Sequence, residues 1–361
     1  MDKRRVVLLF GGRSSEHSIS CATAGGVLRA IDRDRYEVIP VGITREGAFV
    51  LESGDPDRFG LDPERLPEVA DNGTRVLWPE STASREMRVV DAAGIRSLGE
   101  VDVVFPILHG RYGEDGTVQG LFELAGLPYV GNGVLASAMA MDKHVAKTVL
   151  EAAGIAVAPW VTLTRERLAA DEELWLRRTR ALGLPAFVKP ARAGSSVGVT
   201  RVDDWAELGA ALDVAFAEDR TVLVESAMSG REIEIAVLDG PDGPRVSVAG
   251  EVVVTGRGFY DFEAKYLGAD GVELVCPAEL GRGELFELQR VALHAFEAIG
   301  GEGLARVDVF LTGEGFVVNE INTMPGFTPI SMFPTCWMNT GLGYPELIGE
   351  LIEHGAARGA R

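Results

Sequence analysis

Two short stretches near the C-terminal end carry polar side chains that could bind a metal ion. Residues 306–311 (RVDVFL) and 316–322 (FVVNEIN) alternate polar and apolar side chains, as half-buried strands do. Residues 313–315 lie between them, and their Gly-Glu-Gly sequence predicts a three-residue hairpin loop that ends in a left-handed glycine. The pattern therefore predicts a β-hairpin with one polar face.

The predicted loop also sets which side chains meet across the hairpin. With Thr312 opposite Phe316, Asp308 faces Glu320, and all polar groups of the two strands share one face. On the same count, Arg306 faces Asn322. The other face is predicted to carry the apolar side chains of Val307, Val309, Leu311, Val317 and Ile321.

This polar face is costly unless it binds a ligand. Opposed side chains lie about 5 Å apart, where two carboxylates repel by roughly 3 kcal/mol at an effective dielectric near 20. Asp308, Glu320 and Asn322 offer only oxygen ligands, which suit a hard cation such as Mg²⁺ that shares its shell with substrate phosphates. The alternative is a solvated face that Arg306 neutralises.

Composition limits the partners. The chain of 361 residues is long enough for two or three domains, and its net charge of −19 argues against nucleic acid or an anionic membrane as the main partner. Residues 6–10 form an apolar run that is too short for a signal peptide or membrane span, so we expect a cytoplasmic protein. The three cysteines, Cys21, Cys276 and Cys336, are sparse and widely spaced, which predicts reduced structural thiols.

The order of predicted elements favours an α/β fold. Predicted strands at 6–10, 36–42 and 101–108 alternate with helices at about 16–30 and 119–125, which indicates a parallel sheet with ligand loops at its carboxyl edge. Residues 52–100 show too little pattern for an assignment. A helix is predicted over 136–153, with a domain boundary near 130–140. The remaining elements are predicted as strands at 185–190, 222–225, 232–238 and 246–254, and helices at 284–299 and 345–354.

A second candidate site follows the strand predicted at 185–190. Residues 189–198 (KPARAGSSVG) combine Lys189 with a flexible turn whose backbone N–H groups can surround a phosphate. The Gly-Lys-Ser/Thr ending of a Walker loop is absent. An ordinary mobile loop is the alternative interpretation.

Other candidates depend on neighbours that the sequence does not fix. His109 and Glu16 each follow an apolar strand in a glycine-bearing loop, so they could meet over one sheet edge. Glu225 and Glu232 could hold a ribose diol, although their spacing alone favours ordinary surface charge. The long segment 255–271 carries Lys265 and Tyr266 and is typical in length of an active-site lid.

Seven motifs together resemble the D-alanine–D-alanine ligases of the ATP-grasp superfamily. They occur in the family's order over nearly the whole chain, and any single one would be weak. They are FGGRSSEHSIS at 10–20, HGRYGEDGT at 109–117, MDK at 141–143, VKPARAGSSVG at 188–198, YDFEAKY at 260–266, RVD at 306–308 and NEINTMPG at 319–326. One departure is Ala193, where some relatives carry Glu.

The resemblance implies an α/β ATP-grasp fold with a Rossmann-like N-terminal domain. Expected domains are 1–137 for the first substrate, 138–226 as the central ATP-grasp part, and 227–361 with the metal site and a lid at 255–271. The implied reaction joins two D-alanines by way of an acyl phosphate formed from ATP, for peptidoglycan precursor synthesis. It implies ATP as a substrate, two Mg²⁺ (or Mn²⁺) ions, no nucleic acid or membrane partner, and a homodimer.

The resemblance also implies roles for individual residues. Glu16 would hold the ammonium of the first D-alanine, with Ser195 and Tyr266 bonded to it, and His109 would lie near that substrate's carboxyl. Arg306 and the Gly326 N–H would stabilise the oxyanion, while Ser331 and Met332 would bind the second D-alanine. The nucleotide would be held by Lys143, Lys189, Ser196, Glu225, Glu232 and Lys265, and the metal ions by Asp308, Glu320 and Asn322.

Three alternatives remain at this level. Another ATP-grasp ligase, including one that makes D-alanyl-D-lactate, would share these motifs, although Tyr266 favours an amine as the second nucleophile. A catalytically inactive nucleotide-binding module would not need the retained charged residues. A Rossmann oxidoreductase would need a G-x-G-x-x-G fingerprint, which the sequence after residue 10 does not fit.

Overall fold

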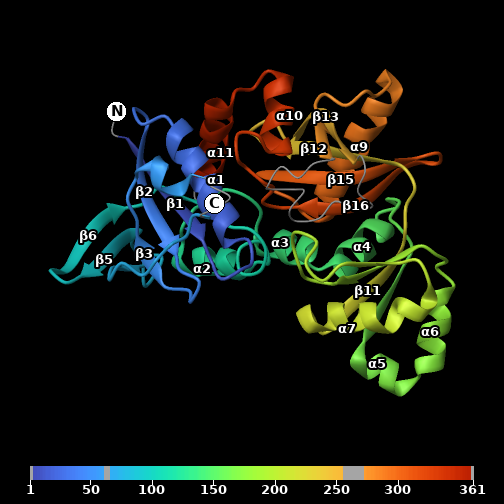
Figure 1. Cartoon of the computed structure of the whole chain (residues 1–361). Coiled ribbons are helices and arrows are strands. Elements are labelled where there is room, and N and C mark those ends of the chain that lie inside the picture. The colour runs from blue at the N-terminus through green and yellow to red at the C-terminus, as the bar shows by residue number, and fades with distance from the viewer. Residues whose placement is uncertain (1–2, 61–65, 255–271, 359–361) are drawn as a thin grey trace.

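The computed structural model describes residues 3–60, 66–254 and 272–358. The described strands form four sheets (Figure 1), and the strands of the small sheet β4-β5-β6 lie between β3 and β7 of the first sheet along the chain. The segment 255–271, with Tyr266 and Lys265, lies outside the described residues.

The first sheet has the order β3-β2-β1-β7. The strands β1 (Arg4–Gly11), β2 (Tyr36–Ile43) and β7 (Val103–Ile107) are parallel, and β3 (Phe49–Leu51) is antiparallel at the edge. Residues 6–10 are at most 1% exposed, as expected for a parallel strand covered on both faces. Helices α1 (His17–Ala30) and α2 (Thr117–Ala125) follow β1 and β7, so the loops before them lie at the carboxyl edge.

Residues 52–100, unassigned from the sequence, form a short helix and a separate three-stranded sheet. They contain η1 (Pro56–Phe59), β4 (Arg75–Leu77), β5 (Glu86–Asp91) and β6 (Gly94–Glu100), paired antiparallel in the order β4-β5-β6. Most of β6 is exposed, and β4 has only three residues, so neither shows a clear alternation of apolar and polar side chains.

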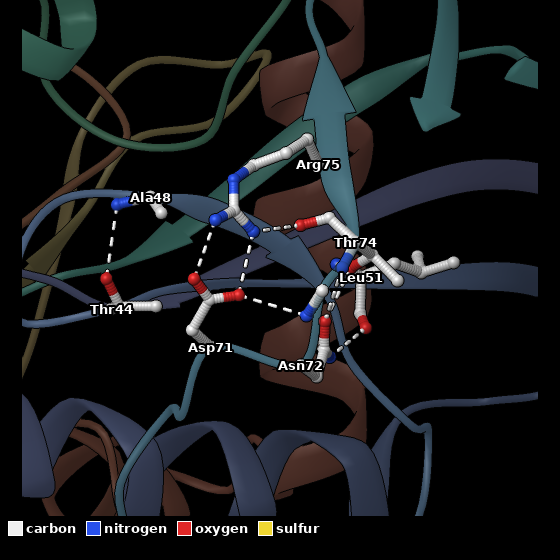
Figure 2. A network of polar contacts seen from close by, with 8 residues as sticks. Thr44, Ala48, Leu51, Asp71, Asn72, Thr74 and Arg75 are labelled. Carbon is white, nitrogen blue, oxygen red and sulfur yellow. Dashed lines mark hydrogen bonds and ion pairs between the residues drawn. The ribbon is translucent and has the colours of Figure 1, made fainter. Parts of the chain in front are cut away.

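A polar network orders the turn that leads into β4 (Figure 2). Arg75 pairs with both carboxylate oxygens of Asp71, at 2.8 and 2.6 Å. Asn72 donates to the Leu51 carbonyl at 2.9 Å and accepts from the Thr74 N–H at 3.0 Å. The turn is therefore tied to β3 by side chains rather than by an apolar core.

The helix predicted over 136–153 is two helices. They are α3 (Val134–Met141) and α4 (Lys143–Ala152), separated by Asp142 in an extended conformation. The Asp142 carboxylate accepts from the His144 and Val145 N–H groups and so caps α4. The prediction of one helix was wrong because the apolar periodicity continues across the break.

The central sheet is antiparallel, with the order β10-β9-β11-β8. Its strands are β8 (Trp160–Thr164), β9 (Ala186–Pro190), β10 (Thr200–Val202) and β11 (Thr221–Ser226). It is accompanied by α5 (Arg165–Ala170), α6 (Glu172–Arg180), η2 (Trp205–Glu207) and α7 (Leu208–Glu218). The loop 191–198 connects β9 to β10.

The C-terminal sheet has the order β14-β13-β12-β15-β16, all antiparallel. Its strands are β12 (Arg231–Leu238), β13 (Arg245–Val254), β14 (Val272–Val275), β15 (Leu304–Thr312) and β16 (Gly315–Asn322). The accompanying helices are α9 (Arg282–Ala298), α10 (Met332–Thr340) and α11 (Tyr344–Arg358). The sequence did not predict α10.

The hairpin of β15 and β16 confirms the predicted pairs of Asp308 with Glu320 and of Arg306 with Asn322. The predicted loop was wrong, because Thr312 pairs with Gly315 and the loop has two residues. A bulge at Asn319 restores the register beyond it. Between the loop and the bulge, the side chains of β16 lie on the opposite faces from those predicted. Phe316 and Val318 are therefore buried, whereas the sequence predicted Val317 on the apolar face.

The C-terminal helix packs onto the first sheet. Leu347, Ile348 and Leu351 of α11 belong to one buried cluster with Phe10 of β1 and Phe105 of β7. In Figure 1 the red helix α11 accordingly lies beside the blue strands of the first sheet. The two ends of the chain thus share one hydrophobic core.

None of the helices in the described part of the chain has the length and apolar character needed to cross a membrane.

Candidate active site

One cavity of about 620 Å³ collects the predicted site residues. Its lining comes from the loops of the first sheet, from the central sheet and from the C-terminal sheet. Fifteen of the seventeen predicted residues line it, and Tyr266 and Lys265 lie outside the described residues. The fifteen are Glu16, His109, Lys143, Lys189, Ser195, Ser196, Glu225, Glu232, Arg306, Asp308, Glu320, Asn322, Gly326, Ser331 and Met332.

Glu16 lies where the loop 191–198 meets the first sheet. Its carboxylate accepts a hydrogen bond from the Ser195 hydroxyl. A Cβ atom added at Gly194 would come within 2.5 Å of Glu16 Oε2, and one at Gly110 within 2.7 Å. Glycine at both positions therefore makes room for a carboxylate that is 5% exposed.

The same loop contains two consecutive non-glycine residues with left-handed backbone. Ser195 has φ 48° and Ser196 has φ 60°. This conformation costs roughly 1 kcal/mol or more per residue. The contact of Ser195 with Glu16 helps to hold that backbone, so the loop and the first domain support each other.

His109 lines the cavity and has one buried ring nitrogen for which the described residues provide no hydrogen-bond partner. Its Nδ1 lies 3.1 Å from the Met324 carbonyl oxygen, which can only accept, so Nδ1 carries the hydrogen. Burial lowers the pKa of this imidazole, although the Glu16 charge opposes the shift. Neutral His109 then has Nε2 as a buried acceptor, and no residue within 3–60, 66–254 or 272–358 donates a hydrogen bond to it.

Glu114 is a site residue that the sequence analysis did not select. It lines the cavity, and its carboxylate accepts from the Gly110 N–H at 2.7 Å and from the Met324 N–H at 3.0 Å. Burial and the nearby charges of Glu16 and Glu320 raise its pKa to about 8. The signal was available, because Glu114 belongs to the same glycine-rich loop as His109.

Arg306 is held between two carboxylates on the sheet. It donates to both oxygens of Asp308 at 2.7 Å and lies 3.0 Å from Glu234. Burial alone would lower the pKa of Arg306, but the charges of Asp308 and Glu234 raise it well above its ordinary value. Glu234 was not predicted, although it faces Asp308 across β12 and β15.

The polar face of the hairpin has the donor chemistry of a Mg²⁺ site. Asp308 and Glu320 lie opposite each other, Asn322 donates to Asp308 at 2.9 Å, and all three line the cavity. No group of three or more His, Cys, Asp or Glu side chains in a metal-binding arrangement occurs in the part of the chain that the structure describes. The donor set therefore fits an ion that takes its remaining ligands from phosphate and water.

A cluster of lysines surrounds a buried carboxylate on the central sheet. Lys189 lies 2.7 Å from Glu225, and Lys147, which was not predicted, lies 3.5 Å from it. Burial alone would raise the pKa of Glu225, but the two lysines lower it, so Glu225 is ionised. Lys143 donates to the Ala193 carbonyl at 2.8 Å and so lies against the loop 191–198.

The start of α10 completes the cavity. Ser331 Oγ lies 2.7 Å from the Thr328 hydroxyl and accepts from the Thr328 N–H at 3.1 Å. A Cβ atom added at Gly326 would lie 3.2 Å from Ser331 Oγ. Met332 packs against Gly250 of β13, where an added Cβ would come within 2.0 Å of its sulfur.

Two family models match the chain. Residues 5–132 match the model described as "D-ala D-ala ligase N-terminus", and residues 149–353 match "D-ala D-ala ligase C-terminus". A D-alanine–D-alanine ligase of Kineococcus radiotolerans is 52% identical over 362 residues, covering 97% of this chain and 96% of the relative. One of Pseudarthrobacter chlorophenolicus is 50% identical, with 97% and 93% covered.

Solved structures agree over the whole length. The VanG D-Ala:D-Ser ligase of Enterococcus faecalis has a TM-score of 0.84 at 35% identity, covering 98% of this chain and 100% of its own. The D-alanine–D-alanine ligase of Coxiella burnetii has a TM-score of 0.82 at 34% identity, covering 100% and 96%. This chain therefore has the ATP-grasp fold and belongs to the D-alanine–D-alanine ligase family.

Proposed function

We propose that the protein joins two D-alanines to D-alanyl-D-alanine, with ATP converted to ADP and phosphate, to supply peptidoglycan precursor synthesis. The observation that carries this proposal is the single cavity, in which Glu16, the loop 191–198 and the polar hairpin face share one space. Family membership supplies the substrate class.

The chemistry follows from the poor reactivity of a carboxylate. The carboxylate of the first D-alanine attacks the γ-phosphorus of ATP, and ADP leaves. The resulting acyl phosphate has a good leaving group, so the amine of the second D-alanine attacks its carbonyl. The tetrahedral intermediate then expels phosphate, and the protein contributes mainly positioning and charge stabilisation.

We assign the amino end of the first D-alanine to Glu16 and His109. The carboxylate of Glu16 complements an ammonium, and Nε2 of neutral His109, which has no partner among the described residues, is an acceptor that suits an N–H group better than a carboxylate. Ser195 orients Glu16. This differs from the position near the substrate carboxyl that the resemblance implies for His109.

Arg306 and the Gly326 N–H are proposed to stabilise the oxyanion. Arg306 is permanently cationic and lines the cavity, and Gly326 lies beside Ser331. The Ser331 hydroxyl and Met332 at the start of α10 would receive the second D-alanine, whose carboxylate also suits the helix N-terminus.

The nucleotide is assigned to the space between the central and C-terminal sheets. Lys143 and Lys189 would neutralise phosphate charge, and the loop residue Ser196 would lie beside them. Glu225 and Glu232 would face the adenine and ribose. Lys265 and Tyr266 keep their proposed roles at the phosphates and at Glu16.

Asp308, Glu320 and Asn322 would hold the two Mg²⁺ (or Mn²⁺) ions. When bound, the ions would neutralise charge on the phosphates and align them. Arg306 pairs with Asp308, but Glu320 adds a second carboxylate, so the hairpin face itself carries one more negative than positive charge.

The proposal is tested by measuring whether ADP release accompanies dipeptide formation. With ATP, Mg²⁺ and D-alanine as the sole amino acid, we expect ADP and a dipeptide identified by mass, and no ADP above background with L-alanine. ATP hydrolysis without dipeptide, or equal rates with both enantiomers, would overturn the proposal.

The second substrate has one competing candidate. The similarity to a D-Ala:D-Ser ligase raises D-serine as an acceptor, and D-lactate would give a depsipeptide. With D-alanine and an equal amount of D-serine or D-lactate present, we expect mainly D-alanyl-D-alanine. If Tyr266→Phe makes no more depsipeptide than the parent protein, the proposed role of Tyr266 in selecting an amine is wrong.

The assembly and location implied by the family remain predictions. We expect a homodimer, which sedimentation velocity would test, and a cytoplasmic location, which cell fractionation would test.

A further inference from the structure

Two of the three cysteines lie side by side next to the cavity. The sulfur atoms of Cys276 and Cys336 are 3.7 Å apart. Cys336 is fully buried in α10, whereas Cys276, directly after β14, is only partly buried. The sequence predicted isolated structural thiols, because sixty residues separate the two positions along the chain.

The elements that carry the two thiols both line the cavity. Leu274, two residues before Cys276, and Met332, one helical turn before Cys336, are lining residues. Both β14 and α10 pack on β13, where the Ala249 carbonyl lies 3.8 Å from the Cys276 sulfur. A bond between the two sulfurs would therefore join two walls of one site.

The pair is chemically unequal. The hydrogen bond between the two thiols lowers the pKa of Cys276, although burial opposes that shift. The hydrogen bond with Cys276, together with burial, raises the pKa of Cys336. Cys276 is the more accessible thiol, so an oxidant reaches it first, and the Cys336 sulfur lies beside it to react next.

We propose that Cys276 and Cys336 form a redox-sensitive modification site, in which a hydroperoxide converts the two thiols to an intramolecular disulfide that slows the reaction at the adjoining cavity. The disulfide itself does not depend on the proposed function, whereas its effect on rate rests on that function.

The step balances with hydrogen peroxide as the oxidant. The Cys276 thiolate attacks one peroxide oxygen, the O–O bond breaks, and protonation of the departing hydroxide gives water and a sulfenic acid at Cys276. The Cys336 sulfur then attacks the Cys276 sulfur, the S–O bond breaks, and a second water leaves. Two thiols lose two electrons and two protons, and the peroxide is reduced to two waters.

We expect the bond to move the cavity wall. A disulfide has a sulfur–sulfur distance of about 2.05 Å, well below the 3.7 Å of the thiols. Rotation of the two side chains can close part of this gap. Because Cys336 is fully buried in α10, we expect α10 and the end of β14 to close the rest, and Met332 and Leu274 to shift with the elements that carry them.

The first experiment maps the bond in the whole protein without substrates. After treatment with hydrogen peroxide, we expect the monomer to lose two hydrogen atoms in mass. After alkylation of the remaining free thiols, we expect a non-reduced protease digest to contain one peptide linking Cys276 to Cys336. Dithiothreitol should reverse both changes. Oxidation of Cys276 to a sulfinic acid, a link between chains, or two free thiols after treatment would overturn the proposal.

The second experiment measures turnover before and after oxidation. We expect roughly a tenfold or larger loss, because a displacement near 1 Å at a substrate-contacting group can cost about 100-fold. Dithiothreitol should restore the rate, which excludes methionine sulfoxide at Met332 as the cause because that product needs a dedicated reductase. A complete disulfide with an unchanged rate would overturn the regulatory half of the proposal.

Matched variants show whether the response to peroxide depends on this pair of cysteines. Cys276→Ser, at a partly buried position, should keep its basal rate and lose the reversible response to peroxide. Cys21→Ser should keep the full response, because Cys21 is buried in α1 and burial raises its pKa to about 12. A response that persists in Cys276→Ser would overturn the proposal. Failure of the reduced parent protein to form dipeptide would instead contradict the proposed function and leave the peptide map as the test of the disulfide.

Discussion

The buried carboxylates around the cavity have different partners, and the difference decides which of them can take up a proton. Glu225 lies beside two lysines, which lower its pKa against the effect of burial. Among the described residues, Glu114 accepts from two backbone N–H groups and no side chain, and burial and neighbouring carboxylates raise its pKa to about 8. Glu114 is thus a carboxyl group of the cavity that titrates close to neutral pH.

Glu114→Gln should change how stability depends on pH. The unfolded chain loses this proton near pH 4.5, while the folded protein keeps it up to about pH 8. Between these values the folded state binds the extra proton, so the contribution of Glu114 to stability falls as pH rises. We expect the urea midpoint of the parent protein to fall more steeply from pH 5.5 to pH 8 than that of Glu114→Gln.

Glu297→Gln provides the control, because Glu297 is an exposed residue of α9. It should follow the parent protein at every pH. Parallel curves for the parent and Glu114→Gln would mean that Glu114 does not hold its proton in the folded state.

Replacing both carboxylates of the hairpin should abolish most turnover. Asp308→Asn with Glu320→Gln removes two charges from the polar face and one partner of Arg306. We expect a loss of roughly 100-fold or more, equivalent to about 3 kcal/mol, and a higher Mg²⁺ concentration for half-maximal rate, measured by ADP release. Glu314→Gln at the exposed loop of the same hairpin is the control. Unchanged turnover in the double variant would contradict the metal assignment.

Motifs located most of the candidate residues, but not the partners that fix their charge. His109 and Arg306 could be selected as site residues because they lie within recognisable sequence motifs. Glu234 and Lys147 could not, since their roles arise from cross-sheet and helix-to-sheet neighbours that only the folded chain brings together. Sequence spacing therefore indicated the site, and tertiary contact determined its electrostatics.

At the scale of elements, the β15–β16 hairpin shows why a correct pairing can follow from a wrong loop. The predicted loop was one residue too long, and the bulge at Asn319 inserts one extra residue in β16 that the prediction did not contain. The two offsets cancel at Asp308 and Glu320. A bulge leaves no mark in the apolar–polar alternation beyond one irregular position, so the sequence could not place it.

The loop 191–198 should be sensitive to a single methyl group. Gly194→Ala would place Cβ within 2.5 Å of Glu16 Oε2 and force that carboxylate away from Ser195. We expect the KM for the first D-alanine to rise roughly tenfold, equivalent to about 1.4 kcal/mol. Initial rates of ADP release at varied D-alanine concentration measure the effect.

Gly209→Ala is the matched control on a helix. Gly209 lies in α7, and an added Cβ meets no atom within 4 Å. We expect this variant to gain about 0.5–1 kcal/mol of stability, since alanine favours the helix, and to keep its KM. An unchanged KM in Gly194→Ala would show that the loop does not depend on this close contact.

At the scale of the whole molecule, the cavity exists only because segments far apart in the sequence are joined. His109 and Glu114 of the first domain bond to Met324, just beyond β16. Ser195 of the central loop bonds to Glu16. Such contacts lie outside any strand or helix, and for that reason local sequence pattern could predict the sheets but not how they meet.

Asn132 is the side chain that ties the first domain most directly to the C-terminal sheet. It is 3% exposed, its amide donates to the Leu304 and Thr323 carbonyls at 2.6 and 3.1 Å, and its oxygen accepts from the Glu302 N–H at 2.9 Å. Asn132→Ala would remove the side-chain partner of two buried carbonyls and of one partly buried N–H. We expect the free energy of unfolding to fall by about 2–4 kcal/mol, measured by urea denaturation.

Asn72→Ala tests whether burial, rather than the number of hydrogen bonds, sets that cost. The Asn72 side chain also makes three hydrogen bonds, one to Leu51 and two with Thr74 (Figure 2), but it is exposed. Water can replace these bonds, so we expect a loss below about 1 kcal/mol. Equal losses of stability at the two positions would mean that the junction between the first domain and the C-terminal sheet is open to water. A junction of that kind could not hold His109 and Met324 in the fixed geometry that the cavity requires.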